Sequence, residues 1–140
     1  VHMSNQAAQS LRVMIVDDQK AMRSIIRNLL SQHDINQISE AADGLDALEK
    51  LMDRRQPNPD VIICDLHMDK MDGMEFCNKV RLSKIETIKT IPVLILTGER
   101  DELSLEVAKQ VGATAVLGKP ISAPDLCQHI ENAVGFSFST

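Results

Sequence analysis

Short apolar runs alternate with segments of helical periodicity along most of this chain. The apolar runs are aliphatic and rich in β-branched residues, which predicts strands, and they lie at 12–16, 37–41, 61–64, 93–96 and 115–117. Apolar residues three and four positions apart predict helices over about 19–33, 45–52, 73–82, 101–111 and 122–134, the last beginning at Ser122 or Asp125. The pattern is therefore a strand–helix unit repeated along the chain.

The strands read as nearly continuous apolar runs rather than as alternating ones. This pattern is typical of a parallel sheet that helices cover on both faces. With right-handed crossovers, we expect an α/β fold with a five-stranded, doubly wound parallel sheet in the flavodoxin-like order 2-1-3-4-5. We expect the domain to span 11–134, after a segment over 1–10 that is disordered or left over from cloning, and before a loose tail over 135–140.

The composition narrows the class of protein. The 140 residues carry a net charge of -5, which disfavours direct nucleic-acid binding because phosphate contacts need clustered Lys and Arg. No apolar run is long enough to span a membrane, and residues 1–10 lack the apolar stretch of a secretory signal. The cysteines Cys64, Cys77 and Cys127 lack metal-type spacing, so we expect reduced, buried thiols in a cytoplasmic protein.

Polar residues stand at the carboxyl ends of four predicted strands, and they are Asp17 with Asp18, Asp65, Thr97 and Lys119. Ligands of an open parallel sheet bind at this edge, where the strand order reverses. In the expected order that point lies between the first and third strands, so the three acids should converge. Each residue alone has a structural explanation, as a helix cap, a turn residue, a strand residue or a solvated lysine. Their joint occurrence at four strand ends favours a functional site.

Three converging carboxylates repel one another, so they bind either protons or a cation. Oxygen ligands favour a hard cation, and Mg²⁺ suits a site with few carboxylates, retained water and a phosphate. Lys119 would add a mobile positive charge, and Thr97 would add a hydroxyl group. A metal ion, a lysine, a hydroxyl and a nucleophilic carboxylate are what phosphoryl transfer needs, because that chemistry is mostly positioning and charge neutralisation.

These motifs resemble those of the response-regulator receiver family, over residues 11–134. The resemblance rests on four segments, which are Val16-Asp17-Asp18, Asp65 with Met71-Asp72-Gly73 downstream, Leu96-Thr97-Gly98 and Gly118-Lys119-Pro120. It implies a two-component switch rather than a conventional enzyme, one that assists its own phosphorylation and dephosphorylation. Asp65 would accept a phosphoryl group from a histidine kinase or a histidine phosphotransfer protein.

The resemblance also implies roles for the other residues. The implied Mg²⁺ site consists of Asp18, Asp65 and the backbone carbonyl of His67 as direct ligands, with Asp17 helping through water. The implied contacts of the phosphoryl oxygens are Thr97 and Lys119, and the Lys119–Pro120 bond would be cis. Phosphorylation would repack the surface of the fourth helix, fifth strand and fifth helix, and so change the affinity for a downstream protein.

Three positions depart from the family pattern. Val116 stands where the family usually has Tyr or Phe, so an aromatic side chain cannot report phosphorylation there. Asp69 replaces a frequent proline, which adds charge beside the metal loop, and Gly118 adds freedom next to Lys119.

Two other functions compete with this interpretation. A Mg²⁺-dependent phosphohydrolase with an Asp nucleophile is the first alternative, and it would carry an Asp-x-Asp motif after the first strand. Neither Asp17-Asp18-Gln19 nor Asp65-Leu66-His67 fits that motif. A phosphorylation-independent interaction domain on the same fold is the second alternative, which Val116 and Asp69 keep open. The sequence does not identify the kinase, the target, the oligomeric state or whether the domain stands alone.

Overall fold

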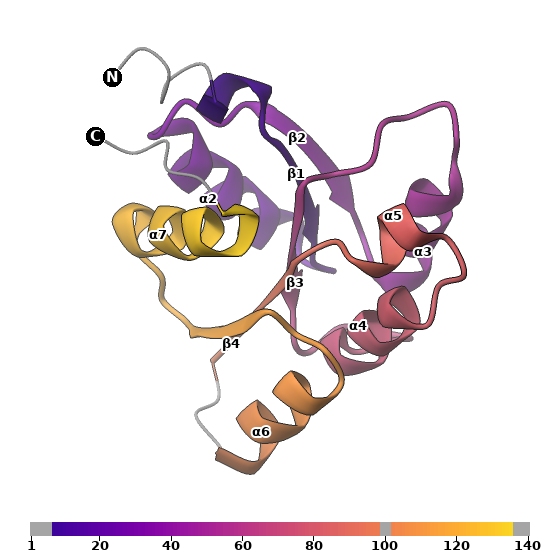
Figure 1. The fold of residues 1–140 in the computed structure, drawn as a ribbon. Helices are drawn as coiled ribbons and strands as arrows, with labels where there is room; N and C mark the ends of the chain where they lie inside the picture. The colour runs from indigo at the N-terminus through magenta and orange to yellow at the C-terminus, as the bar shows by residue number, and fades with distance from the viewer. Residues whose placement is uncertain (1–6, 99–101, 136–140) are drawn as a thin grey trace.

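The computed structural model describes residues 7–98 and 102–135, the first three residues of the second range by their backbone only. Within these ranges five strands form one sheet in the order β2-β1-β3-β4-β5 (Figure 1). The strands are β1 (Arg12–Val16), β2 (Gln37–Ala41), β3 (Val61–Asp65), β4 (Val93–Thr97) and β5 (Ala115–Gly118). All neighbouring strands run parallel, so the predicted fold class and strand order are confirmed.

Helices cover both faces of the sheet (Figure 1). On one face lie α2 (Lys20–Ser31) and α7 (Ala123–Val134). On the other lie α3 (Gly44–Met52), α4 (Gly73–Arg81), α5 (Glu86–Lys89) and α6 (Glu102–Gln110). Strand side chains alternate between the two layers, because successive residues of a strand point to opposite faces. Ile15, for example, packs with the α2 and α7 layer, and Met14 packs with the other.

The structure differs from the prediction at two places. The helix α5 was not predicted, because Glu86–Lys89 is a single turn and is too short to show a period. Residues 7–10 form a helical turn with Ala8 only 1% exposed, so the disorder expected there is wrong for these four residues. The expected loose tail lies outside the described residues, apart from Gly135, which ends α7 in a left-handed conformation.

The start of the last helix, which the sequence left open, is at Ser122. Its side chain accepts a hydrogen bond from the backbone N–H of Asp125 at 3.2 Å. This is the geometry of an N-cap residue, and it satisfies a backbone donor that the helix leaves unpaired. The three cysteines are free and buried, as expected.

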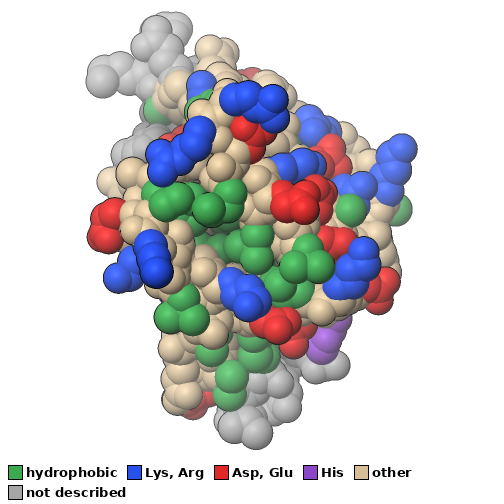
Figure 2. Space-filling view, turned by 90° about the vertical axis from the view of Figure 1, so that its right-hand side faces the viewer, with side chains coloured by type: hydrophobic (Ala, Val, Ile, Leu, Met, Phe, Trp, Pro, Cys, Tyr) green, Lys and Arg blue, Asp and Glu red, His purple; other side chains and the backbone are tan. Residues whose placement is uncertain are grey.

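One side of the molecule presents apolar surface among charges. Figure 2 looks onto the side where α3, α4 and α5 lie and shows hydrophobic side chains bordered by both signs of charge. On α3, Leu45 and Met52 are 48% and 56% exposed. No helix in the described ranges combines the length and the apolar character that crossing a bilayer requires.

Gly73 begins α4 in close contact with the end of β3. Its N–H donates to the carbonyl of Leu66 at 2.8 Å, which closes the loop between the strand and the helix. Asp72 precedes it and caps α4 by accepting from the N–H of Glu75 at 2.8 Å. These two hydrogen bonds therefore fix the end of the loop that follows Asp65 against the start of α4.

We expect Gly73→Ala to lower the free energy of unfolding by about 1–3 kcal/mol, the usual cost of forcing an atom into a packed site. A Cβ at this position would lie 2.5 Å from the carbonyl oxygen of Asp65. Urea unfolding followed by circular dichroism measures the change. Gly98→Ala is the matched control because nothing lies within 4 Å of its added Cβ. Equal losses in the two variants would contradict the steric argument.

Candidate functional site

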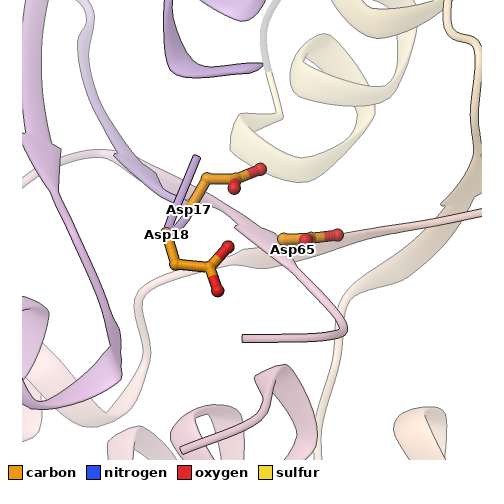
Figure 3. A group of neighbouring side chains, drawn as sticks. All are labelled: Asp17, Asp18 and Asp65. Carbon is orange, nitrogen blue, oxygen red and sulfur yellow. The ribbon is translucent and has the colours of Figure 1, made fainter. Parts of the chain in front are cut away.

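Three carboxylates meet at the carboxyl edge of the sheet. Asp17 and Asp18 follow β1, and Asp65 is the last residue of β3, the strand beside it. Each of the three offers a carboxylate oxygen, and these oxygens lie within 4.8 Å of one another (Figure 3). The strand order makes this possible, because β1 and β3 are neighbours and end at the same edge. The predicted convergence of the acids is therefore present.

One oxygen of each carboxylate is held by a donor from a different loop. The N–H of Gln19 donates to Oδ1 of Asp17 at 2.8 Å, and the N–H of Asp69 donates to Oδ2 of Asp18 at 3.1 Å. Nζ of Lys119 donates to Oδ1 of Asp65 at 2.8 Å. In the described chain no hydrogen bond reaches the second oxygen of Asp17, which is buried. This leaves a carboxylate oxygen of the cluster available to a cation.

The electrostatics of Asp17 agree with a cation site. This residue is 1% exposed, and burial is the main cause that raises the pKa of its carboxyl above the ordinary value, with the negative charges of Asp65 and Asp18 adding to it. A buried carboxylate oxygen without a hydrogen bond costs free energy. Hard oxygen ligands around such a group fit Mg²⁺, which takes few protein carboxylates and keeps several waters.

Lys119 and Thr97 complete the polar edge. β4 and β5 pair with Thr97 opposite Gly118, and the N–H of Lys119 donates to the carbonyl of Thr97 at 2.9 Å. Thr97 is 2% exposed, so it lies inside this edge rather than in solvent. The Lys119–Pro120 bond is cis, which confirms that expectation. The structure thus brings Lys119 onto Asp65 and places Thr97 on the adjoining strand end.

The loop between β3 and α4 forms another wall of the site. His67 and Asp69 have exposed side chains in this loop, whereas Met71 is 5% exposed and packs into the apolar layer beneath α3 and α4. Met68 and Met74 pack against the same layer, as expected for residues beneath the loop. The role of the His67 carbonyl as a metal ligand stays a prediction.

Arg23 is a residue of the site region that the sequence reasoning missed. Its Nη1 donates to the backbone carbonyl of Asp17 at 2.6 Å, and its Nε bonds Glu40 at 2.9 Å. Arg27, one turn further along α2, bonds the other oxygen of Glu40 at 2.7 Å. The spacing of the two arginines on one face of the helix was a signal that could have found them.

A cavity of about 270 Å³ lies beside Thr97, between β5, α6 and α7. Its lining includes Val116, Leu105, Asp125 and His129. Val116, at the position noted above for lacking an aromatic side chain, contributes only a small branched group. Space is therefore present next to the strand end that carries Thr97.

We expect Asp17→Asn to raise the free energy of unfolding of the metal-free protein by on the order of 1 kcal/mol, the ordinary scale of a point substitution. The amide removes a buried charge and keeps an acceptor for the N–H of Gln19. Urea unfolding in a chelator measures this, with the exposed, left-handed Asp34 changed to Asn as control. Mg²⁺ should stabilise the wild type more than Asp17→Asn. A destabilised Asp17→Asn would contradict the account of charge repulsion.

The same carboxyl predicts a pH dependence. Because the folded state raises the pKa of Asp17 above its ordinary 3.8, the folded state binds this proton more tightly than the unfolded chain. The contribution of this group to stability should fall as pH rises from 3.8 through the raised value, and then stay constant. The unfolding free energy of wild type minus that of Asp17→Asn, measured without metal, isolates the effect. If this difference in unfolding free energy increased with pH in this window, it would contradict a raised pKa for Asp17.

Comparison with known proteins identifies the family. A sequence model described as response regulator receiver domain matches residues 13–131. The chemotaxis protein CheY-3 of Vibrio cholerae is 32% identical over 123 residues, which are 88% of this chain and 91% of that protein. The structure of CheY4 of Vibrio cholerae has a TM-score of 0.76 and 31% identity over 88% of this chain and 98% of that one. A chain in the CheX–CheY–BeF3–Mg²⁺ complex of Borrelia burgdorferi has a TM-score of 0.76 and 25% identity over 87% of each chain. Since the family match covers most of the sequence, the protein belongs to the response regulator receiver domain family.

Proposed function

We propose that this receiver accepts a phosphoryl group on Asp65 and that Asp17, Asp18 and Asp65 hold Mg²⁺. Membership of the family makes the chain a phosphorelay acceptor switch rather than a conventional enzyme. The observation that carries the residue assignment is the carboxylate cluster within 4.8 Å, with Lys119 bonded to Asp65 at 2.8 Å. The Borrelia burgdorferi complex, which contains BeF3 and Mg²⁺, supports the same chemistry.

In this proposal each residue of the site has one role. A carboxylate oxygen of Asp65 attacks phosphorus, so that an acyl phosphate forms and the bond from phosphorus to the donor nitrogen breaks. Lys119 and Thr97 contact the phosphoryl oxygens and stabilise their negative charge. Bound Mg²⁺ would supply further charge neutralisation, with the His67 carbonyl as an additional ligand. Burial holds the Asp17 side chain in place before the ion arrives.

The output of the switch would be the surface formed by α6, β5 and α7. Phosphorylation adds about -1.5 to -2 charge to Asp65. Lys119, which already bonds Asp65 at 2.8 Å, would move onto the phosphoryl oxygens, and Thr97 would be drawn toward the same oxygens. Thr97 lines the cavity that Val116, Leu105 and His129 share, so its movement changes the packing of that surface. A downstream protein that prefers one packing then shifts the population of the two states. With Val116 in place, this coupling runs through aliphatic packing rather than through an aromatic side chain.

The partners follow from the same chemistry. We infer that a histidine kinase or a histidine phosphotransfer protein supplies the phosphoryl group in the cytoplasm, and that the domain assists both the transfer and the later hydrolysis. The free, buried cysteines support a reducing compartment.

The decisive test is phosphorylation by acetyl phosphate. In the presence of Mg²⁺, intact-protein mass spectrometry should show the gain of one phosphoryl group, and the gain should disappear in Asp65→Asn or when a chelator replaces Mg²⁺. Asp34→Asn, an exposed aspartate outside the carboxylate cluster, is the matched control and should keep the gain. A gain that survives in Asp65→Asn would exclude Asp65 as the acceptor, and no gain in the wild type would favour a phosphorylation-independent interaction domain. Sustained hydrolysis of small phosphate esters would favour an enzyme instead.

A further inference from the structure

The carboxylate of Asp18 is bound to the backbone of the opposite loop. The N–H of Asp69, four residues beyond Asp65, donates to Oδ2 of Asp18 at 3.1 Å. The side chain of Asp69 is exposed, so this contact belongs to the backbone and not to the carboxylate of residue 69. We propose that the Asp69 N–H positions Asp18 for cation binding, an inference that rests on the proposed Mg²⁺ site.

Asp18 needs such a contact more than its neighbours do. Asp17 and Asp65 are 1% and 8% exposed, so the surrounding chain restricts their side chains. Asp18 is the more exposed member of the cluster and has the freedom to rotate toward solvent. The negative charges of Asp17 and Asp65 favour that rotation while no ion is bound. The Asp69 N–H, which lies in the loop after β3, opposes this rotation of Asp18, because a hydrogen bond to a carboxylate is charge-assisted.

The loop that carries this donor is itself fixed. The N–H of Met71 donates to the carbonyl of Asp69 at 2.7 Å, and Met71 is buried beneath the loop. Lys70 adopts a left-handed conformation with φ 69°, and its Nζ lies 3.6 Å from Oδ2 of Asp43 at the start of α3. The two residues that follow Asp69 thus hold the loop, and with it the direction of the Asp69 N–H. A fixed donor orders Asp18 without the loss of side-chain entropy that a lysine or arginine would incur.

The identity of residue 69 then matters in a specific way. Every residue except proline supplies a backbone N–H, so the proposal predicts that removing the Asp69 carboxylate keeps the contact and that proline alone removes it. Asp69→Ala and Asp69→Pro both lack the carboxylate. Their difference therefore isolates the N–H from the charge.

The experiment is a Mg²⁺ titration of the two variants, followed by amide NMR shifts because the chain has no Trp to report binding by fluorescence. Asp69→Pro should bind Mg²⁺ about three- to tenfold more weakly than Asp69→Ala, the effect of losing one hydrogen bond of ordinary net strength. Equal or tighter binding in Asp69→Pro, with both variants folded by circular dichroism, would overturn the proposal. Absence of Mg²⁺ binding in the wild type itself would instead overturn the proposed function.

A second measurement needs no proline. In the metal-free wild type the Asp69 amide should exchange with solvent deuterium slowly, and in Asp18→Ala the same amide should exchange at least several-fold faster, since its acceptor is gone. The Gly73 amide, which donates to the backbone of Leu66, is the internal control and should keep its rate. An unchanged Asp69 rate in Asp18→Ala would contradict the proposal even if Asp69→Pro failed to fold.

Discussion

Mutual repulsion among three carboxylates is the constraint on which this structure depends. The sheet places Asp17, Asp18 and Asp65 within reach of one ion, and the metal-free domain must hold like charges together at that edge. Burial makes this more costly at Asp17, whose second oxygen has no hydrogen bond in the described part of the chain. The site therefore keeps a free-energy cost that a divalent cation would relieve, and this is the physical basis of the Mg²⁺ binding proposed above.

The rest of the edge limits that repulsion through donors from separate loops. Lys119 contributes the direct counter-charge to Asp65, whereas Gln19 and Asp69 contribute only backbone N–H groups. These donors come after β5, after β1 and after β3, so no single loop determines the geometry. Arg23 adds a bond to the backbone of Asp17 and leaves the carboxylate oxygens alone. Such an arrangement keeps positive charge near the acids and leaves the second oxygen of Asp17 without a hydrogen bond in the described residues.

The sheet and the acid cluster were predictable from sequence for related reasons. Continuous aliphatic runs mark buried parallel strands, and the rules of strand order then determine which strand ends become neighbours. Asp17, Asp18 and Asp65 therefore follow from local pattern plus topology, as does the placement of Thr97 and Lys119. The single turn at Glu86–Lys89 was not predictable, because four residues show no helical period.

Other features depend on backbone geometry that residue types do not encode. Asp69 was noted for its charge and for standing where proline is frequent, yet its contact with Asp18 uses the N–H that every residue except proline has. Likewise, the choice between Ser122 and Asp125 as the start of α7 depended on which side chain accepts and which backbone donates. Residue types thus predict which side chains gather at the site, but they do not predict the hydrogen bonds that backbone groups make there.

The ion pairs of Glu40 have a consequence for how the domain behaves in a crowded solution. Glu40 lies on β2, an outer strand of the sheet, where it bonds Arg23 and Arg27, and its backbone carbonyl accepts from Lys50. Outer strands expose unpaired peptide groups that can template the addition of a foreign strand, and charged side chains along them disfavour such pairing. The arginine–glutamate cluster thus places charge along an outer strand, which disfavours the addition of a foreign strand there, and the same Arg23 also bonds the backbone of the first acidic loop.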